Sequence, residues 1–175
     1  MGNLVAAYNG ESNAHVRYAA FALKADEEGF TQVASLFRAA SRAEEIHAAN
    51  HATVIRRMGG NPVADIQPTD VLTTAENLVA AIAGETYERD VMYPAFIELA
   101  KHDGNKPGIR TFEYAIAAEI EHAILYTKAL QSLSSMKGGK TMYFVCPVCG
   151  KTVTATDFDK CPVCGALPEK FLPIS

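Results

Sequence analysis

The chain has 175 residues, of which 49% are hydrophobic and 21% are charged, and its net charge is −4 at pH 7. This length suits one domain with a small appendage, and the apolar fraction is ample for a buried core. The slightly acidic balance gives no reason to expect nucleic acid or an anionic membrane as a partner. No apolar run approaches the ~20 residues that span a bilayer. No export signal is visible at the amino terminus, so we expect a cytoplasmic protein.

Two long helices are predicted in the first third of the chain. Residues 4–28 lack proline, and Tyr8, Glu11 and Tyr18 recur on one face at three- and four-residue steps. Residues 31–58 form the second helix, which the glycines and proline of residues 59–62 end. Residues 59–72 then read as a long crossover connection.

Two further helices follow this connection. A capping box at Thr73–Glu76 starts a helix that should run to about residue 101, with Pro94 kinking or loosening the turn around it. The fourth helix should span residues 107–136. Four long helices with one long connection predict a mainly α protein with a ferritin-like four-helix bundle, at residues 1–137.

The tail differs in kind from the bundle. Residues 143–145 and 152–154 have the composition of strands, but residues 141–175 hold too few apolar side chains to fold alone. A metal must therefore organise them. We expect a small metal-bound β and loop domain at residues 141–175, after a short flexible linker.

The bundle carries a pattern of metal ligands. Glu44 and His47 are three residues apart on one helix, and Glu119 and His122 are three apart on another, so each pair shares a helical face. One inward glutamate on each remaining helix, Glu11 and Glu85, completes a set that holds two metal ions in a bundle core. Glu44 and Glu119 are best placed to bridge. Carboxylate and imidazole donors suit iron, manganese or zinc; the alternative is that these pairs are solvated at the surface.

Several nearby residues extend this pattern. Glu88 lies three residues after Glu85 and is either a ligand that moves with oxidation state or a surface partner of a basic residue. The tyrosines Tyr18, Tyr93 and Tyr126 lie seven or eight residues from proposed ligands. They are either donors to ligand carboxylates or core filler. His15 and His51 read as neighbours of the site rather than ligands.

The tail holds four cysteines in two Cys-Pro-Val-Cys-Gly sequences, at Cys146, Cys149, Cys161 and Cys164. Each pair presents two thiolates from one tight turn, so the four predict a tetrahedral site. Zinc and iron both accept four thiolates, and the spacing does not choose between them. We favour iron, because a one-electron relay has a purpose beside an iron-binding bundle.

These motifs resemble the rubrerythrin family along nearly the whole chain. The resemblance is carried by Glu44–His47, Gly84–Glu88, Met92–Pro94, Glu119–His122 and the tail, which is similar to a shortened rubredoxin domain. It implies a non-haem di-iron peroxidase with two irons in the bundle and one iron on four cysteines. The metal residues that it implies are Glu11, Glu44, His47, Glu85, Glu88, Glu119, His122, Cys146, Cys149, Cys161 and Cys164.

The resemblance also implies roles and partners. Glu88 would exchange with His47 between oxidation states, and Tyr18 and Tyr93 match the family's tyrosines beside the metal site. Hydrogen peroxide is the expected substrate. An external NAD(P)H-dependent reductase or a rubredoxin is the expected electron donor, because no nicotinamide or flavin motif occurs in the chain. The family implies a homodimer or higher homo-oligomer, in which the cysteine-bound iron of one chain lies near the bundle site of its partner.

Two competing functions remain open. A ferritin-like protein that oxidises and stores iron would use the bundle but leave the cysteine module idle. A binding or scaffolding protein with structural zinc would be colourless, whereas iron bound to four thiolates is red.

Overall fold

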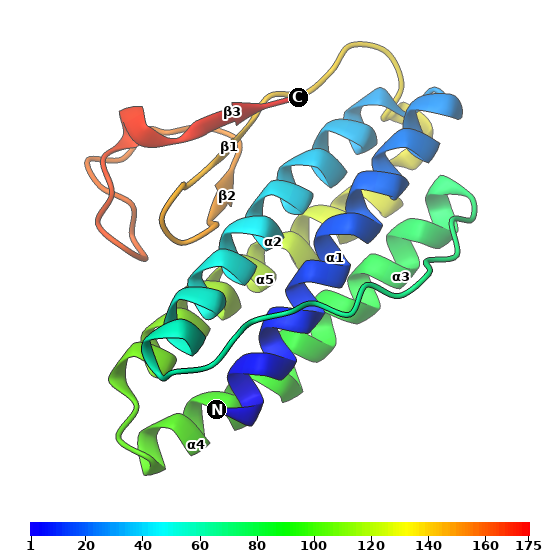
Figure 1. The fold of residues 1–175 in the computed structure, drawn as a ribbon. Helices are drawn as coiled ribbons and strands as arrows, with labels where there is room; N and C mark the ends of the chain where they lie inside the picture. Colours follow the sequence, from blue (N-terminus) through cyan, green and yellow to red (C-terminus); the bar gives the residue numbers. More distant parts are fainter.

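A computed structural model describes all of residues 1–175 (Figure 1). Long helices lie side by side along one axis, and a small sheet sits against one flank of them. The helices are α1 (Gly2–Glu27), α2 (Thr31–Arg57), α3 (Thr74–Tyr87), α4 (Tyr93–His102) and α5 (Lys106–Gln131). The predicted fold class, a ferritin-like bundle followed by a small metal-binding β region, is confirmed.

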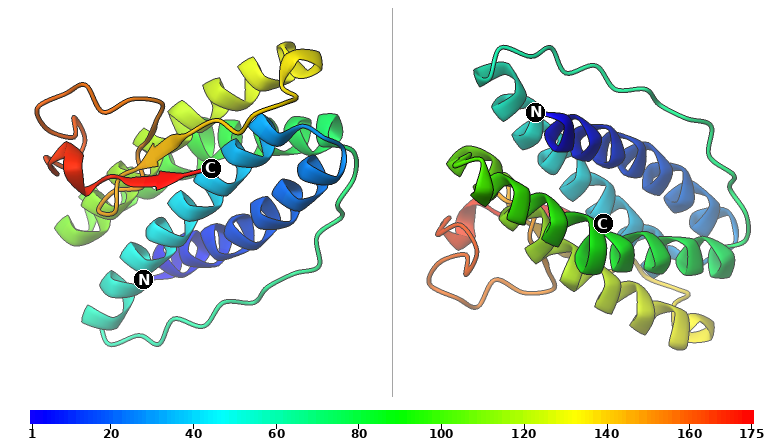
Figure 2. Two further views of the ribbon diagram at one scale, coloured as in Figure 1. Left: turned by 90° about the horizontal axis from the view of Figure 1, so that it is seen from above. Right: turned by 90° about the horizontal axis from the view of Figure 1, so that it is seen from below.

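The long connection between α2 and α3 runs the length of the bundle across α1 (Figures 1 and 2). Side chains of α1 hold it there. The amide of Asn13 donates to the carbonyl of Asp65 across 2.9 Å, and Asn9 accepts from the Asp65 backbone amide across 2.8 Å. The predicted capping box then starts α3, with Thr73 accepting from the Glu76 amide. This crossover lets α3 and α5 pack against the α1–α2 hairpin.

The third predicted helix is divided. A π-helical segment, Glu88–Met92, separates α3 from α4, and Pro94 lies in the first turn of α4. Proline has no N–H to donate, and its ring crowds the carbonyl four residues before it, so the preceding turn widens. The prediction of a loosened turn near Pro94 was right, but the disturbance covers five residues and includes Glu88.

The tail forms a three-stranded antiparallel sheet in the order β2-β1-β3. Its strands are β1 (Tyr143–Val145), β2 (Thr152–Val153) and β3 (Leu172–Ile174). The sheet and its loops lie against α2 and α5 (Figures 1 and 2). Tyr143 and Val145 of β1 are buried and join the main apolar core of the bundle. The tail is therefore packed on the helices of its own chain.

The core has two apolar clusters with a polar layer between them. One cluster includes Tyr18, Phe37 and Tyr126, and the other includes Tyr93 and Phe112. Along α1, α2 and α5 the proposed metal ligands fall between residues of the two clusters. The apolar clusters thus exclude water from both ends of the polar layer. None of the helices is long and apolar enough to cross a membrane.

Candidate metal centres

The polar layer contains the six predicted ligands from the two Glu-x-x-His pairs and the two single glutamates. They come from α1, α2, α3 and α5, and each is at most 1% exposed. Their donor atoms form two groups, in each of which all the atoms lie within 4.8 Å of one another. The groups are Glu11, Glu44, His47 and Glu119, and Glu44, Glu85, Glu119 and His122.

Two glutamates are shared between the groups. Glu44 lies 2.8 Å from Nδ1 of His47 and 3.2 Å from Nδ1 of His122, while Glu119 lies 3.1 Å from each of these atoms. Glu11 belongs only to the His47 group and Glu85 only to the His122 group. This arrangement suits two neighbouring cations, with Glu44 and Glu119 between them and one terminal carboxylate at each end.

Without cations, the polar layer holds buried carboxylates that repel one another and have oxygen atoms without hydrogen-bond partners. Burial, followed by the charge of Glu88 and other carboxylates, raises the pKa of Glu11 well above its usual value. Burial likewise raises the pKa of Glu85 to about 8. Buried carboxylate oxygens of Glu11, Glu44, Glu85 and Glu119 have no hydrogen-bond partner. An unpaired buried charge costs several kcal/mol even after relaxation, so this donor set fits bound cations.

The histidines balance part of this charge. Burial alone would lower the pKa of His47, but the charges of Glu119 and Glu44 outweigh it and raise this pKa to about 10. For Glu44, hydrogen bonds and charges from both histidines lower the pKa against the effect of burial. Cations would take over this balance and leave the imidazoles neutral, as metal ligands must be.

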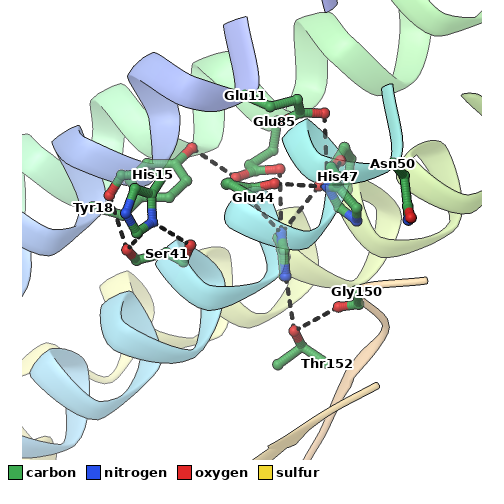
Figure 3. Close-up of polar contacts among 12 residues, drawn as sticks. Glu11, His15, Tyr18, Ser41, Glu44, His47, Asn50, Glu85, Gly150 and Thr152 are labelled. Carbon is green, nitrogen blue, oxygen red and sulfur yellow. Dashed lines mark hydrogen bonds and ion pairs between the residues drawn. The ribbon is translucent and has the colours of Figure 1, made fainter. Parts of the chain in front are cut away.

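Residues of the tail fix how both ligand histidines face the site, and Figure 3 shows His47 with Gly150 and Thr152 of the tail below it. Nε2 of His47 lies 3.1 Å from the carbonyl oxygen of Cys149, which can only accept, so Nε2 carries the proton. Nε2 of His122 lies 3.0 Å from Oγ1 of Thr152, whose own hydrogen is donated to the carbonyl of Gly150. A neutral imidazole therefore has its free lone pair on Nδ1, the nitrogen that faces the carboxylates.

Two tyrosines orient the terminal carboxylates. The hydroxyl of Tyr18 donates to Glu85 across 2.6 Å (Figure 3), and the hydroxyl of Tyr93 donates to Glu11. Tyr126 is buried nearby but makes no hydrogen bond, which supports the alternative that it fills the core. Its ring instead packs against Phe37 and Tyr18, with centroid distances of 5.2 and 5.6 Å.

Glu88 lies in the π-helical segment, outside both donor groups. The residue is half-buried. Burial of its carboxyl and the charges of Glu119 and Glu85 raise its pKa well above the usual value. The side chain is therefore close to the polar layer without joining either donor group. Its role as a ligand stays a prediction.

The two remaining histidines of the bundle lie outside the donor groups. His15 contacts the backbone carbonyl and hydroxyl of Ser41 at 2.8 and 3.0 Å, on the flank of the bundle. His51 is fully buried and contacts the hydroxyls of Tyr93 and Thr111 at 3.1 and 2.9 Å. Neither joins a donor group, in keeping with the expectation that they neighbour the site.

The four cysteines converge in the tail, all with free thiols and with sulfur atoms within 4.8 Å of one another. Cys146 and Cys164 are 3.5 Å apart at sulfur, and Cys149 and Cys161 are 3.7 Å apart. A tetrahedral metal with sulfur ligands at ~2.3 Å spaces them by ~3.8 Å. Phe158 and Phe171 cover the cluster. The distances fit one four-thiolate metal.

Sequence reasoning missed the residues that join the two centres. Asn50 of α2 donates to the carbonyl of Val148 across 2.8 Å, and Thr152 and Gly150 contact the ligand histidines' outer side. Asn50 and Val148 are 98 positions apart in the sequence, and His122 and Thr152 are 30 apart. No periodicity or motif links positions so far apart. The resemblance implied that this closeness arises between partner chains; here it occurs within one chain.

A ferritin-like bundle with two carboxylate and histidine donor groups, joined to a four-thiolate module, defines a class of non-haem metalloprotein with two centres. The sequence profile of rubrerythrin matches residues 2–130. The chain is 36% identical to rubrerythrin-2 of Clostridium acetobutylicum, over 96% of this chain and 92% of that one. It belongs to the rubrerythrin family, as the motifs predicted.

Other relatives agree with this assignment. Nigerythrin of Nitratidesulfovibrio vulgaris is 37% identical over 93% of this chain and 80% of its own length. The structure of fully reduced, all-ferrous nigerythrin matches with a TM-score of 0.89 and 35% identity, covering 98% of this chain and 85% of that one. Bacterioferritin of Desulfovibrio desulfuricans, at 21% identity and a TM-score of 0.72 over 79% and 86% of the two chains, shows the shared bundle fold.

The cofactor prediction, two irons in the bundle and one on four cysteines, agrees with the donor groups and with the family. The chain is accordingly an oxidoreductase of the di-iron class.

Proposed function

We propose that this protein is a peroxidase that reduces hydrogen peroxide to water and so protects against oxidative stress. The balanced reaction is H2O2 + 2 e⁻ + 2 H⁺ → 2 H2O. The observation that carries the proposal is the position of His47. Its Nδ1 lies among the bundle carboxylates, and its Nε2 lies 3.1 Å from the carbonyl of Cys149, one of the four thiolate residues. One imidazole thus connects the two centres.

When bound, the two bundle irons supply Lewis acidity and two electrons for breaking the O–O bond, and the cysteine-bound iron supplies electrons singly. The protein's own residues hold this chemistry in place. Glu44 and Glu119 lie between the two metal positions, and Tyr18 and Tyr93 hold the terminal carboxylates by donating to them. The apolar clusters on both sides keep bulk water out.

Glu88 is proposed to exchange with His47 as the oxidation state changes. Two features support this. His47 now contacts the carboxylates, and Glu88 lies on a π-helical segment, a geometry that is frequent at functional sites. In the other state, Glu88 would swing into the donor group while His47 leaves it.

Electrons must come from outside the chain. We propose an NAD(P)H-dependent reductase or a rubredoxin as donor, and hydrogen peroxide as the substrate. A homodimer or higher oligomer follows from the family resemblance, with relay within each chain supported by the packing of the tail on its own bundle.

The alternative, iron oxidation and storage, draws on the fold shared with bacterioferritin. Iron storage would not use the four-thiolate module that contacts a ligand histidine, so we prefer the peroxidase function. Solution size separates the two functions, since storage needs a large hollow shell and the peroxidase needs only a small oligomer.

The decisive experiment combines metal analysis, a visible spectrum and peroxide consumption by the reduced protein. Three irons per chain, the red colour of an iron with four thiolates, and rapid peroxide loss would support the proposal. A colourless zinc protein, or an iron protein that leaves peroxide untouched after full reduction, would refute it.

A further inference from the structure

Beyond its contacts with metal ligands, Tyr93 belongs to a longer line of hydrogen bonds. Its hydroxyl lies 3.1 Å from Nε2 of His51, and Nδ1 of His51 lies 2.9 Å from Oγ1 of Thr111. His51 and Tyr93 are fully buried, and Thr111 is 5% exposed. The line thus runs from Glu11, through a tyrosine and a histidine, to a threonine on α5.

The hydrogen bonds in this line all point one way. Tyr93 has a single hydroxyl hydrogen, which it donates to Glu11, so its oxygen can only accept from His51. His51 must then carry its proton on Nε2, which leaves Nδ1 to accept from Thr111. Every donor faces the metal site, and the tautomer of His51 follows from the contacts on its two sides.

The outer end of the line opens on a pocket. Thr111 lines a cavity of about 270 Å³ together with Asn50, Thr53, Arg57, Lys106 and Arg110. The three cations make no ion pair in the structure. Nearby positive charge favours the anionic form of an acid, so it makes solvent in this pocket a readier proton donor. Thr111 thus borders this pocket on one side and His51 on the other.

The line has no equivalent on the other side of the site. Tyr18 donates to Glu85, but its ring is packed among Phe21, Phe37 and Tyr126, and its hydroxyl has no further partner. The hydrogen bonds on this side therefore stop at Tyr18, inside the apolar cluster. On the Tyr93 side, by contrast, the hydrogen bonds continue to a residue that lines a surface pocket.

We propose that Thr111, His51 and Tyr93 form a proton relay from this pocket to Glu11, and that it supplies protons for peroxide reduction. The proposal rests on the proposed function, in which each peroxide consumes two protons. In each transfer, solvent gives a proton to Oγ1 of Thr111 as the threonine passes its own to Nδ1 of His51. Nε2 of His51 passes a proton to Tyr93, and Tyr93 passes one to Glu11. Glu11 hands its proton to the departing oxygen, so no residue gains or loses a proton overall. Each transfer leaves the proton of His51 on Nδ1, and the contacts on its two sides select the form protonated on Nε2 again before the next transfer. Thr111 and His51 are therefore positioning residues that act through Tyr93.

The first test replaces the outer hydroxyl. Thr111→Val keeps the shape of the side chain but removes its proton, Thr111→Ser keeps the proton, and Thr53→Val is the control. Thr53 lines the same pocket, but its hydroxyl donates to the backbone of Ala49, off the line. The rate at which peroxide reoxidises the fully reduced protein is measured in H2O and in D2O, at equal metal content.

Thr111→Val should slow this reoxidation by about 100-fold, the low end of what a positioned proton donor contributes, and should change the solvent isotope effect. Thr111→Ser should restore both, and Thr53→Val should alter neither. A merely structural role for Thr111 would leave the isotope effect unchanged. An unchanged rate and isotope effect in Thr111→Val would overturn the relay.

A second test needs no turnover. In protein loaded with zinc in place of iron, nitrogen NMR of the histidine rings reports which nitrogen of His51 is protonated. The relay requires the proton on Nε2; a proton on Nδ1 would reverse the line and overturn the proposal. Failure of the unaltered protein to reduce peroxide would refute the proposed function instead. The tautomer of His51 would still test the direction of the hydrogen bonds in the relay.

Discussion

Nε2 of His47 lies 3.1 Å from the carbonyl oxygen of Cys149, so a ligand of the bundle site and a ligand of the tail site are one hydrogen bond apart. The next residue, Gly150, packs so closely on the imidazole that a Cβ there would overlap it. Gly150 also has a φ of 78°, a conformation that side chains disfavour. The approach of the tail to α2 therefore depends on a residue without a side chain.

The first prediction concerns this close approach. Gly150→Ala should push the tail away from His47 and slow the reduction of the bundle site by an external donor. Gly165→Ala is the matched control, because Gly165 has a φ of 79° but open space around its Cβ position. Both variants should lose about 1 kcal/mol of stability from backbone strain, measured by denaturant unfolding. Equal donor-driven reduction rates in the two variants would argue against the contact as the electron path.

The second prediction concerns Glu88. Glu88→Ala should keep two irons per chain, because six other ligands remain, yet lower peroxide turnover by about 100-fold, as the loss of a participating side chain does. Asp90→Ala is the control: Asp90 is in the same π-helical segment but is exposed and pairs with Arg89. Iron analysis and stopped-flow measurements check both. Normal turnover in Glu88→Ala would remove this residue from the mechanism.

The third prediction separates the two centres. Cys161→Ser removes one thiolate from the tail site, and Cys161 belongs to the tail donor group and to neither bundle group. The reduced variant should react once with peroxide at the bundle site but should not cycle when donor is supplied. Peroxide consumption is followed over one turnover and over many. Sustained cycling would show that electrons reach the bundle by another route.

The fourth prediction concerns pH and metal removal. In the metal-free protein, burial raises the pKa of Glu85 from 4.5 to about 8, and neighbouring carboxylates raise that of His47 from 6.5 to about 10 against the effect of burial. For each group, at a pH between its unfolded and its folded pKa, the folded state holds a proton that the unfolded state has released. The free energy of unfolding should therefore fall as pH rises from about 6 to about 9.

Bound metal should abolish this decline, because ligands give up those protons when the cations bind. Thermal unfolding of metal-free and metal-loaded protein across this pH range provides the measurement. A metal-free protein that grows more stable toward pH 9 would show that the carboxylates and histidines are not buried together.

Some predictions remain untested. The division of the chain into residues 1–137 and 141–175 is one, and the roles of individual ligands are another. The family, the fold class and the presence of two metal centres are confirmed.

The sequence by itself determined which faces of the helices carry ligands and that the cysteines would form one site. These follow from local periodicity: Glu44 and His47 share a face because a helix turns every 3.6 residues, and each Cys-x-x-Cys is a single turn. Tertiary structure alone decided which nitrogen of His47 faces the carboxylates, where the tail docks, and that Thr111 meets His51 across 60 positions. Those outcomes depend on how separate elements pack, and no local period encodes them.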